Sequence, residues 1–314
     1  LEFRRVLCRS LAPMETDRAG DEGSPLSFTL SVLDIPGATV ETFHPKAVHL
    51  YGNTLYVAND APGHYSLEVF DVSSGNVRHV KSMVEWMNGD KKETFAGEPN
   101  GVTRSYGKIY VTNTGSRTDV FDAETYEFIT CIGTGTWGEG GYQTVHAFDV
   151  TASQGAVFIR DKRKLVVVLE QDVQPGSAAR VPIYSRSVNL QEAMGTYAVA
   201  ARNDGFLYVT AQNKNIIYLF DPADIRAGDT GFAPYLVTLG FEKSPQSIAF
   251  VGDRLFVTLR VDDKRSELWE ISPKNGKLLQ DFTDSMVYPE KIAGARHTLL
   301  VVDRATQTVK AIGL

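Results

Sequence analysis

The chain has 314 residues and a net charge of −6, and its composition excludes several classes of protein. Hydrophobic residues at 43% and charged residues at 22% are typical of a globular protein with a sizeable core. No basic cluster indicates a nucleic-acid partner, and no apolar run is long enough for a transmembrane segment. The two cysteines, Cys8 and Cys131, provide neither a disulfide framework nor the spacing of a metal site.

The first 26 residues do not resemble part of a folded domain. Residues 1–10, LEFRRVLCRS, are basic, lack the apolar core of a signal peptide, and look like translated sequencing-adaptor DNA. Residues 12–25 are polar, contain glycine and show no periodicity. We therefore expect residues 1–26 to be a non-native and disordered lead-in to the fold.

A short apolar motif recurs six times and organises the rest of the chain. Neighbouring copies lie about 50 residues apart, the spacing of a repeat architecture. Each copy is rich in Leu, Val, Ile, Tyr and Phe and leads into a polar loop, which is typical of a β-strand. The copies are LYVAN at Leu55, IYVTN at Ile109, VFIRD at Val157, LYVTA at Leu207, LFVTL at Leu255 and LLVVD at Leu299.

Each motif lies within a longer unit that predicts four antiparallel strands. In the unit from Glu98 to Gly133, an opening PNGV is followed by KIYVTN, TDVFD and YEFITCIG, with turn residues between them. The last unit ends at Leu314 without a fourth strand. The segment SFTLSVLD, near the start of the chain, alternates apolar and polar residues and can supply that strand.

The sequence therefore predicts an all-β fold, a six-bladed β-propeller of four-stranded antiparallel blades closed by the N-terminal strand joining the last blade. A two-domain β-sandwich does not explain six regular copies of one motif. Helix is expected to be nearly absent, with residues 85–92, EWMNGDKK, as a single turn. The expected domain covers 27–314, with the closing strand at 27–35 and blades at about 44–86, 98–134, 145–186, 196–240, 244–283 and 287–314.

The repeated pattern Pro-x-[Ala/Gly]-Val, Leu-Tyr-Val-[Ala/Thr]-Asn and Val-Phe-Asp resembles the NHL and YVTN classes of propeller repeat. Its strongest copies begin at Pro45 and Pro99, and the resemblance covers nearly all of 27–314. It implies a propeller of bacterial origin, located in the periplasm or at the cell surface. It leaves the function open, because propellers include scaffolds, sugar and peptide binders, lactonases and lyases.

The first strand of each predicted blade begins with a polar residue that we expect at the mouth of the central channel. The following position is small in every blade except the last, which has Lys291. We expect these polar residues to form either the hydrated lining that any propeller channel has or a ligand site. Ring closure makes the first and last blades neighbours, so Lys46 and Glu290 are expected to form a salt bridge. The set comprises Lys46, Asn100, His146, Tyr197, Gln246 and Glu290.

A metal or acid–base centre is the alternative for the same position. The ring contributes His146 and Glu290, and Asp60, Asp161 and Asp303 follow second strands toward the same rim. Metal sites need several such ligands to converge, and this set is thin. We therefore predict no metal and no cofactor, with a divalent cation or an acid–base pair of His146 and Glu290 as the alternative of a lactonase- or lyase-like enzyme.

Two long segments between blades contain tryptophans, Trp86 and Trp137, that we expect on the channel-mouth face. Aromatic side chains on loops over a cavity are typical of carbohydrate or peptide recognition, although they can also cover the apolar rim of a sheet. We predict a non-enzymatic, monomeric binding protein. Its channel-mouth face takes a small molecule, a carbohydrate or a protein.

Overall fold

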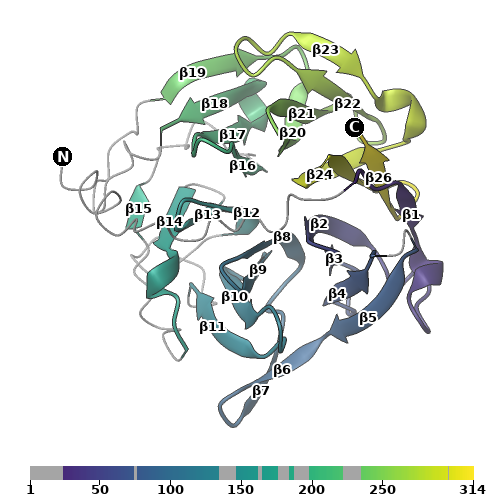
Figure 1. The fold of residues 1–314 in the computed structure, drawn as a ribbon, viewed down its shortest axis with the longest axis vertical. Coiled ribbons are helices and arrows are strands. Elements are labelled where there is room, and N and C mark those ends of the chain that lie inside the picture. Colours follow the sequence, from purple (N-terminus) through teal and green to yellow (C-terminus); the bar gives the residue numbers. More distant parts are fainter. Residues whose placement is uncertain are drawn as a thin grey trace.

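The computed structural model describes residues 24–73, 76–133, 146–161, 165–175, 184–186, 198–221, 235–295 and 297–314. It confirms the predicted architecture: six four-stranded antiparallel sheets surround a central axis as the blades of a propeller (Figure 1). The innermost strands of the blades converge at the centre of the ring, where their first residues can form a common site.

The blades follow one another around the ring in chain order. From the axis outward, blades one to three consist of β2 (Pro45–Tyr51), β3 (Thr54–Asn59), β4 (Ser66–Asp71), β5 (Arg78–Met83); β8 (Pro99–Ser105), β9 (Lys108–Asn113), β10 (Arg117–Asp122), β11 (Phe128–Ile132); and β12 (Ala147–Ser153), β13 (Ala156–Asp161), β14 (Leu165–Leu169), β15 (Tyr184–Arg186). Blades four to six consist of β16 (Val199–Ala201), β17 (Leu207–Ala211), β18 (Ile216–Phe220), β19 (Tyr235–Gly240); β20 (Ser244–Val251), β21 (Arg254–Arg260), β22 (Ser266–Ile271), β23 (Leu278–Asp281); and β24 (Pro289–Ala295), β25 (Thr298–Asp303), β26 (Thr308–Gly313), β1 (Phe28–Leu30).

The ring closes as predicted, because β1 pairs antiparallel with β26 and becomes the outer strand of the sixth blade. The strand is shorter than expected, however, and ends at Leu30. The Ser31 side chain accepts a hydrogen bond from the Leu33 amide, and Asp34 bonds back to the Ser31 amide, which starts a 3-10 turn. This local cap stops the strand before its expected end at residue 35.

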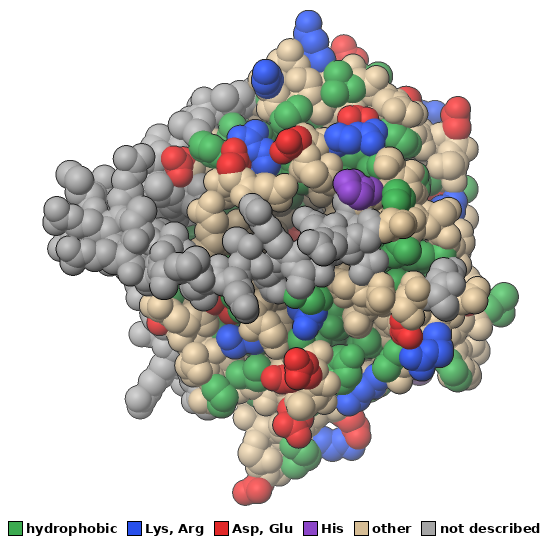
Figure 2. Space-filling view, viewed as in Figure 1, with side chains coloured by type: hydrophobic (Ala, Val, Ile, Leu, Met, Phe, Trp, Pro, Cys, Tyr) green, Lys and Arg blue, Asp and Glu red, His purple; other side chains and the backbone are tan. Residues whose placement is uncertain are grey.

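The face of the ring in Figure 2 shows Lys and Arg side chains interspersed with Asp and Glu. Arg78–Asp71 and Lys92–Glu85 are examples of exposed ion pairs in this protein. Such surface pairs contribute little to stability, about 0–1 kcal/mol each. Within the described residues, no helix is long and apolar enough to cross a membrane.

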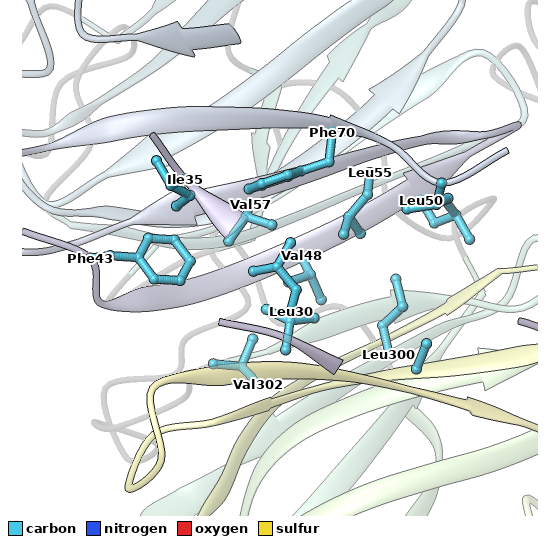
Figure 3. Close-up of a cluster of buried hydrophobic side chains, with 13 residues drawn as sticks. Leu30, Ile35, Phe43, Val48, Leu50, Leu55, Val57, Phe70, Leu300 and Val302 are labelled. Carbon is cyan, nitrogen blue, oxygen red and sulfur yellow. The ribbon is translucent and has the colours of Figure 1, made fainter. Parts of the chain in front are cut away.

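The hydrophobic core lies between neighbouring blades, because each sheet has two apolar faces to cover. In the cluster that joins blades six and one, Leu30 of the closing strand packs with Val48 and Leu55 of blade one and with Leu300 and Val302 of blade six (Figure 3). Leu30, Leu55, Leu300 and Val302 are fully buried. The closing strand therefore contributes to packing as well as to backbone pairing.

The segment expected as a helical turn at 85–92 is instead part of a β-hairpin, β6 (Glu85–Asn88) and β7 (Lys91–Thr94). Its Gly-Asp loop explains the difference, because Asn88 pairs with Lys91 and Gly89 adopts a positive φ of 61° that suits the first position of a two-residue hairpin turn. Arg117 holds the hairpin against blade two through Glu93 and the Thr94 carbonyl, each at 3.0 Å.

The expected exposure of Trp86 is wrong. Its side chain lies under this hairpin and is only 8% exposed. The indole ring contacts Phe95 and Phe121 edge-on, with centroids 4.9 Å away, and stacks on Phe128 at 5.8 Å. Trp86 therefore covers the apolar rim of the sheet and is not offered to a ligand.

Candidate functional site

A β-bulge displaces one residue near the start of the first strand in each of the five blades for which the structure describes this position. In β2, Pro45 pairs with Asn59 and Ala47 with Ala58, so that Lys46 is the extra residue between them. A bulge re-aims the extra side chain out of the regular alternation. The five bulged residues are Lys46, Asn100, Phe148, Gln246 and Glu290. All five line one cavity of about 440 Å³ at the mouth of the channel.

In the third blade, this geometry corrects the predicted ring. The bulged residue is Phe148, since Ala147 pairs with Asp161 and Asp149 with Arg160. His146 precedes the strand, and its amide donates to Asp161 Oδ1 at 2.8 Å. Its ring stacks on Phe148 with centroids 5.9 Å apart, and it is not among the described residues that line the cavity. The predicted ring position of His146 is therefore wrong by two residues.

The spacing between the first and second strands contains the signal that identifies Phe148. Val48 pairs with Val57, Val102 with Val111, and Val150 with Ile159, each across the same number of residues. Aligning Phe148 instead with Val48 breaks this count, although the letters of TVHAF match HPKAV well. Counting residues back from the second-strand motif locates the bulged residue more reliably than matching similar letters, because the count reflects backbone pairing.

The predicted salt bridge between the first and last blades is present inside the cavity. Lys46 Nζ lies 2.8 Å from Glu290 Oε1 and 3.9 Å from Asp60 Oδ2, and Arg304 approaches the same Glu290 oxygen at 3.5 Å. Burial favours a raised pKa for Glu290, but the positive charges of Lys46, Arg304 and Lys291 outweigh it, so that the pKa lies below its ordinary value. Burial raises the pKa of Asp60, which Lys46 only partly offsets.

An ion pair between opposite blades forms the floor of the cavity. Lys291, directly after the bulge in blade six, lies 3.4 Å from Asp149 Oδ2, directly after the bulge in blade three. The Val199 amide of blade four also donates to Asp149, at 3.0 Å. Burial raises the pKa of Asp149 and lowers that of Lys291, and each partner opposes the shift of the other.

This ion pair separates the two ends of the channel. Lys291 lines the 440 Å³ cavity, whereas Asp149 lines a second cavity of about 220 Å³ together with His49, Thr103 and Arg104. A molecule at the mouth between the bulged residues therefore meets this ion pair at the inner end of the cavity.

Small residues at the same position in other blades leave room for the pair. A Cβ atom on Gly101 would lie 2.8 Å from the Asp149 Cα atom and 3.1 Å from its Oδ1 atom. Ser247 instead links two first strands, because its hydroxyl accepts a hydrogen bond from the Ile292 amide at 3.1 Å. Ala47, Gly101 and Ser247 occupy the small position as predicted, but in blade three the residue at this position is Asp149 and not the predicted Ala147.

The remaining predicted site residues do not join this cavity in the described structure. Tyr197 and Trp137 lie outside the described residues. Asp161 and Asp303 accept backbone N–H groups from the segments entering the first strands, as in the bonds from Val287 and Tyr288 to Asp303 at 2.9 Å. Within the described ranges, no group of three or more His, Cys, Asp or Glu side chains is arranged to hold a metal ion.

No protein-family model matches the chain, and no curated protein matches it. Solved structures with the same fold include virginiamycin B lyase from Staphylococcus aureus, with a TM-score of 0.58, 12% identity, and coverage of 92% of this chain and 99% of that one. A catalytically inactive histidine-to-alanine variant of that lyase with quinupristin gives a TM-score of 0.56 at the same identity and coverage. The Cps50 (Swd1) β-propeller domain from Myceliophteria thermophila gives 0.55, with 12% identity and coverage of 88% and 99%.

The chain therefore shares the propeller fold both with an enzyme, the lyase, and with the Cps50 (Swd1) domain. At 12% identity these likenesses show the fold alone and leave the chemistry of the channel mouth to be argued from its own residues.

Proposed function

We propose that this chain is a ligand-binding β-propeller that takes a small polar molecule into the channel-mouth cavity. The observation that supports it best is the convergence of five bulged side chains from five blades on one cavity of about 440 Å³. Ligand cavities commonly measure about 300–1,000 Å³ and contain a few placed polar groups. A ring needs no bulges to close, so their repetition at one position indicates a shared task.

The ion pair at the inner end of the cavity supports a ligand site over a merely wet channel. The Asp149–Lys291 pair gives the cavity a defined depth, and the Lys46–Glu290 pair fixes two of its walls. Asn100 and Gln246 are 4% and 8% exposed, so their amides are held rather than freely rotating in water. Groups held in this way lose little conformational entropy on binding.

A ligand-observed NMR screen of water-soluble fragments tests this function. We expect cavity-bound fragments to lose about tenfold in affinity in Asn100→Ala, the equivalent of one hydrogen bond. The matched control is Asn275→Ala, in the exposed turn between β22 and β23, which should bind as the unaltered protein does. His146→Ala should also retain binding, because His146 is outside the ring. Equal binding by Asn100→Ala and Asn275→Ala would refute a ligand site at this cavity.

The competing function is a lyase- or lactonase-like enzyme with a metal or acid–base site at the same mouth. It would use His146 with Glu290, yet only Glu290 is among the described residues lining the cavity. Under our proposal, treatment with a chelator leaves the Tm and fragment binding unchanged. A stoichiometric divalent ion in purified protein, with binding lost on its removal, would instead favour the enzyme.

A further inference from the structure

Gln246 and Glu290 are equivalent bulged residues of neighbouring blades five and six, and their strands are tied together. Thr258 of blade five donates its hydroxyl to the Glu290 carbonyl at 2.9 Å, and the Ile292 amide donates to Ser247 Oγ at 3.1 Å. The two side chains line the same cavity. The backbone at these two residues is therefore held side by side at the mouth of the cavity.

Each of these two side chains has one oxygen that no described group donates to. Gln246 uses its Nε2 atom toward the Tyr288 hydroxyl at 3.4 Å, while its Oε1 atom is buried without a partner. Glu290 receives Lys46 and Arg304 on Oε1, while its Oε2 atom is buried without a partner. An unsatisfied buried acceptor costs about 1–3 kcal/mol, so both oxygens call for a donor.

The charges around the cavity balance, which indicates that this donor is neutral: Lys46, Arg260, Lys291 and Arg304 are matched by Glu98, Asp263, Glu290 and, below the cavity, Asp149. Each basic residue lining it already has an acidic partner: Lys46 and Arg304 contact Glu290, Lys291 contacts Asp149, and Arg260 contacts Asp263. A cation at the unpartnered oxygen of Glu290 would meet the positive charges of Lys46 and Arg304 close by. An anion would have to displace a carboxylate from one of these pairs.

Two aromatic rings line the same cavity as the residues that carry these buried, unpartnered oxygens. Phe148 is half-buried, and Tyr288 is 6% exposed and bonded to Gln246. An aromatic ring offers an apolar face next to the polar groups. A ligand that carries several hydroxyl groups on one side and C–H groups on another matches both features.

We infer that the ligand of this cavity is a neutral carbohydrate whose hydroxyl groups donate to Gln246 Oε1 and Glu290 Oε2 while its ring lies against Phe148. This inference rests on the ligand-binding function proposed above. It narrows the ligand to uncharged sugars, whose hydroxyls supply donors without bringing a charge that the paired residues must accommodate.

The test is saturation-transfer NMR with glucose, galactose, mannose and N-acetylglucosamine as neutral probes, and with glucosamine and glucuronate as charged relatives of glucose. We expect at least one neutral sugar to bind and to lose about tenfold in affinity in Gln246→Leu, the equivalent of one hydrogen bond. Gln280→Leu, on the exposed outer strand β23, is the matched control and should bind normally. Glu290→Gln, which turns one acceptor into a donor, serves as a second variant with the same expected loss.

The outcomes distinguish failure of the carbohydrate inference from failure of the proposed ligand-binding function. If fragments bind in the Asn100-dependent manner but no sugar does, the carbohydrate inference fails and ligand binding stands. If glucosamine or glucuronate binds more tightly than glucose, the ligand is charged and the inference is wrong. Sugar binding that is unchanged in both Gln246→Leu and Glu290→Gln would also overturn it, since the two acceptors would then be ordinary solvated lining. If neither sugars nor fragments bind, both proposals fail.

Discussion

Replacing Asp149 with asparagine destabilises the propeller by about 3 kcal/mol, because the buried ammonium of Lys291 loses its counter-charge. The Lys291 side chain is 8% exposed and lies 3.4 Å from Asp149. Asparagine keeps an oxygen that can accept from the Val199 amide, so the variant removes the charge with little change in shape. Urea denaturation at neutral pH measures the loss. Stability equal to that of the unaltered protein would show that the pair does not hold the channel together.

The pH dependence of the Asp149→Asn variant identifies Lys291 as the cause. Burial lowers the pKa of Lys291, and without Asp149 nothing opposes that shift as strongly. The folded variant then binds fewer protons than its unfolded chain as the pH rises toward the ordinary lysine pKa. Its free energy of unfolding therefore increases with pH relative to that of the unaltered protein. Adding Lys291→Met should remove both this slope and most of the lost stability.

Replacing Leu30 with alanine destabilises the fold by about 2–5 kcal/mol, the usual cost of emptying a fully buried leucine site. Leu30 is 0% exposed and packs between the first and sixth blades, so the cavity would form where the ring closes. Thermal unfolding followed by circular dichroism measures the effect. The result would show that β1, with only three residues, holds the closure largely through this one side chain.

Leu33 provides the matched control for Leu30, because it lies in the adjoining 3-10 turn and is 92% exposed. Leu33→Ala should change stability by less than about 0.5 kcal/mol. Removing β1 altogether should leave the outer edge of β26 unpaired and favour association of chains through that edge. If Leu30→Ala were as mild as Leu33→Ala, closure would not depend on packing of this strand.

The repeat pattern was sufficient to predict the blades because it is local. Each copy carries its own apolar strands and turn residues, and the missing fourth strand of the last copy required a donor elsewhere in the chain. The hairpin at 85–94 was missed although a two-residue loop such as Gly89-Asp90 is a hairpin signal. The length of β1 was overestimated because Ser31 and Asp34 favour a cap that the alternation of residues does not reveal.

The candidate site was predictable where a proline directly precedes the bulged residue, as at Lys46, Asn100, Gln246 and Glu290. The prediction failed in the third blade, where no proline precedes the bulged residue and the sequence around His146 resembles the strand entries of the other blades. The Asp149–Lys291 pair has no local signature beyond one lysine at a small position. Asp149 and Lys291 come from opposite blades, so whether they come into contact depends on the width of the closed ring.

The measurement that tests the central claim most directly is a crystal structure of the protein soaked in the neutral sugar that binds most tightly in solution. The account predicts a sugar in the channel-mouth cavity, with hydroxyl groups within hydrogen-bond distance of Gln246 Oε1 and Glu290 Oε2 and its ring beside Phe148. A sugar bound elsewhere, with ordered water alone between Gln246 and Glu290, would contradict it.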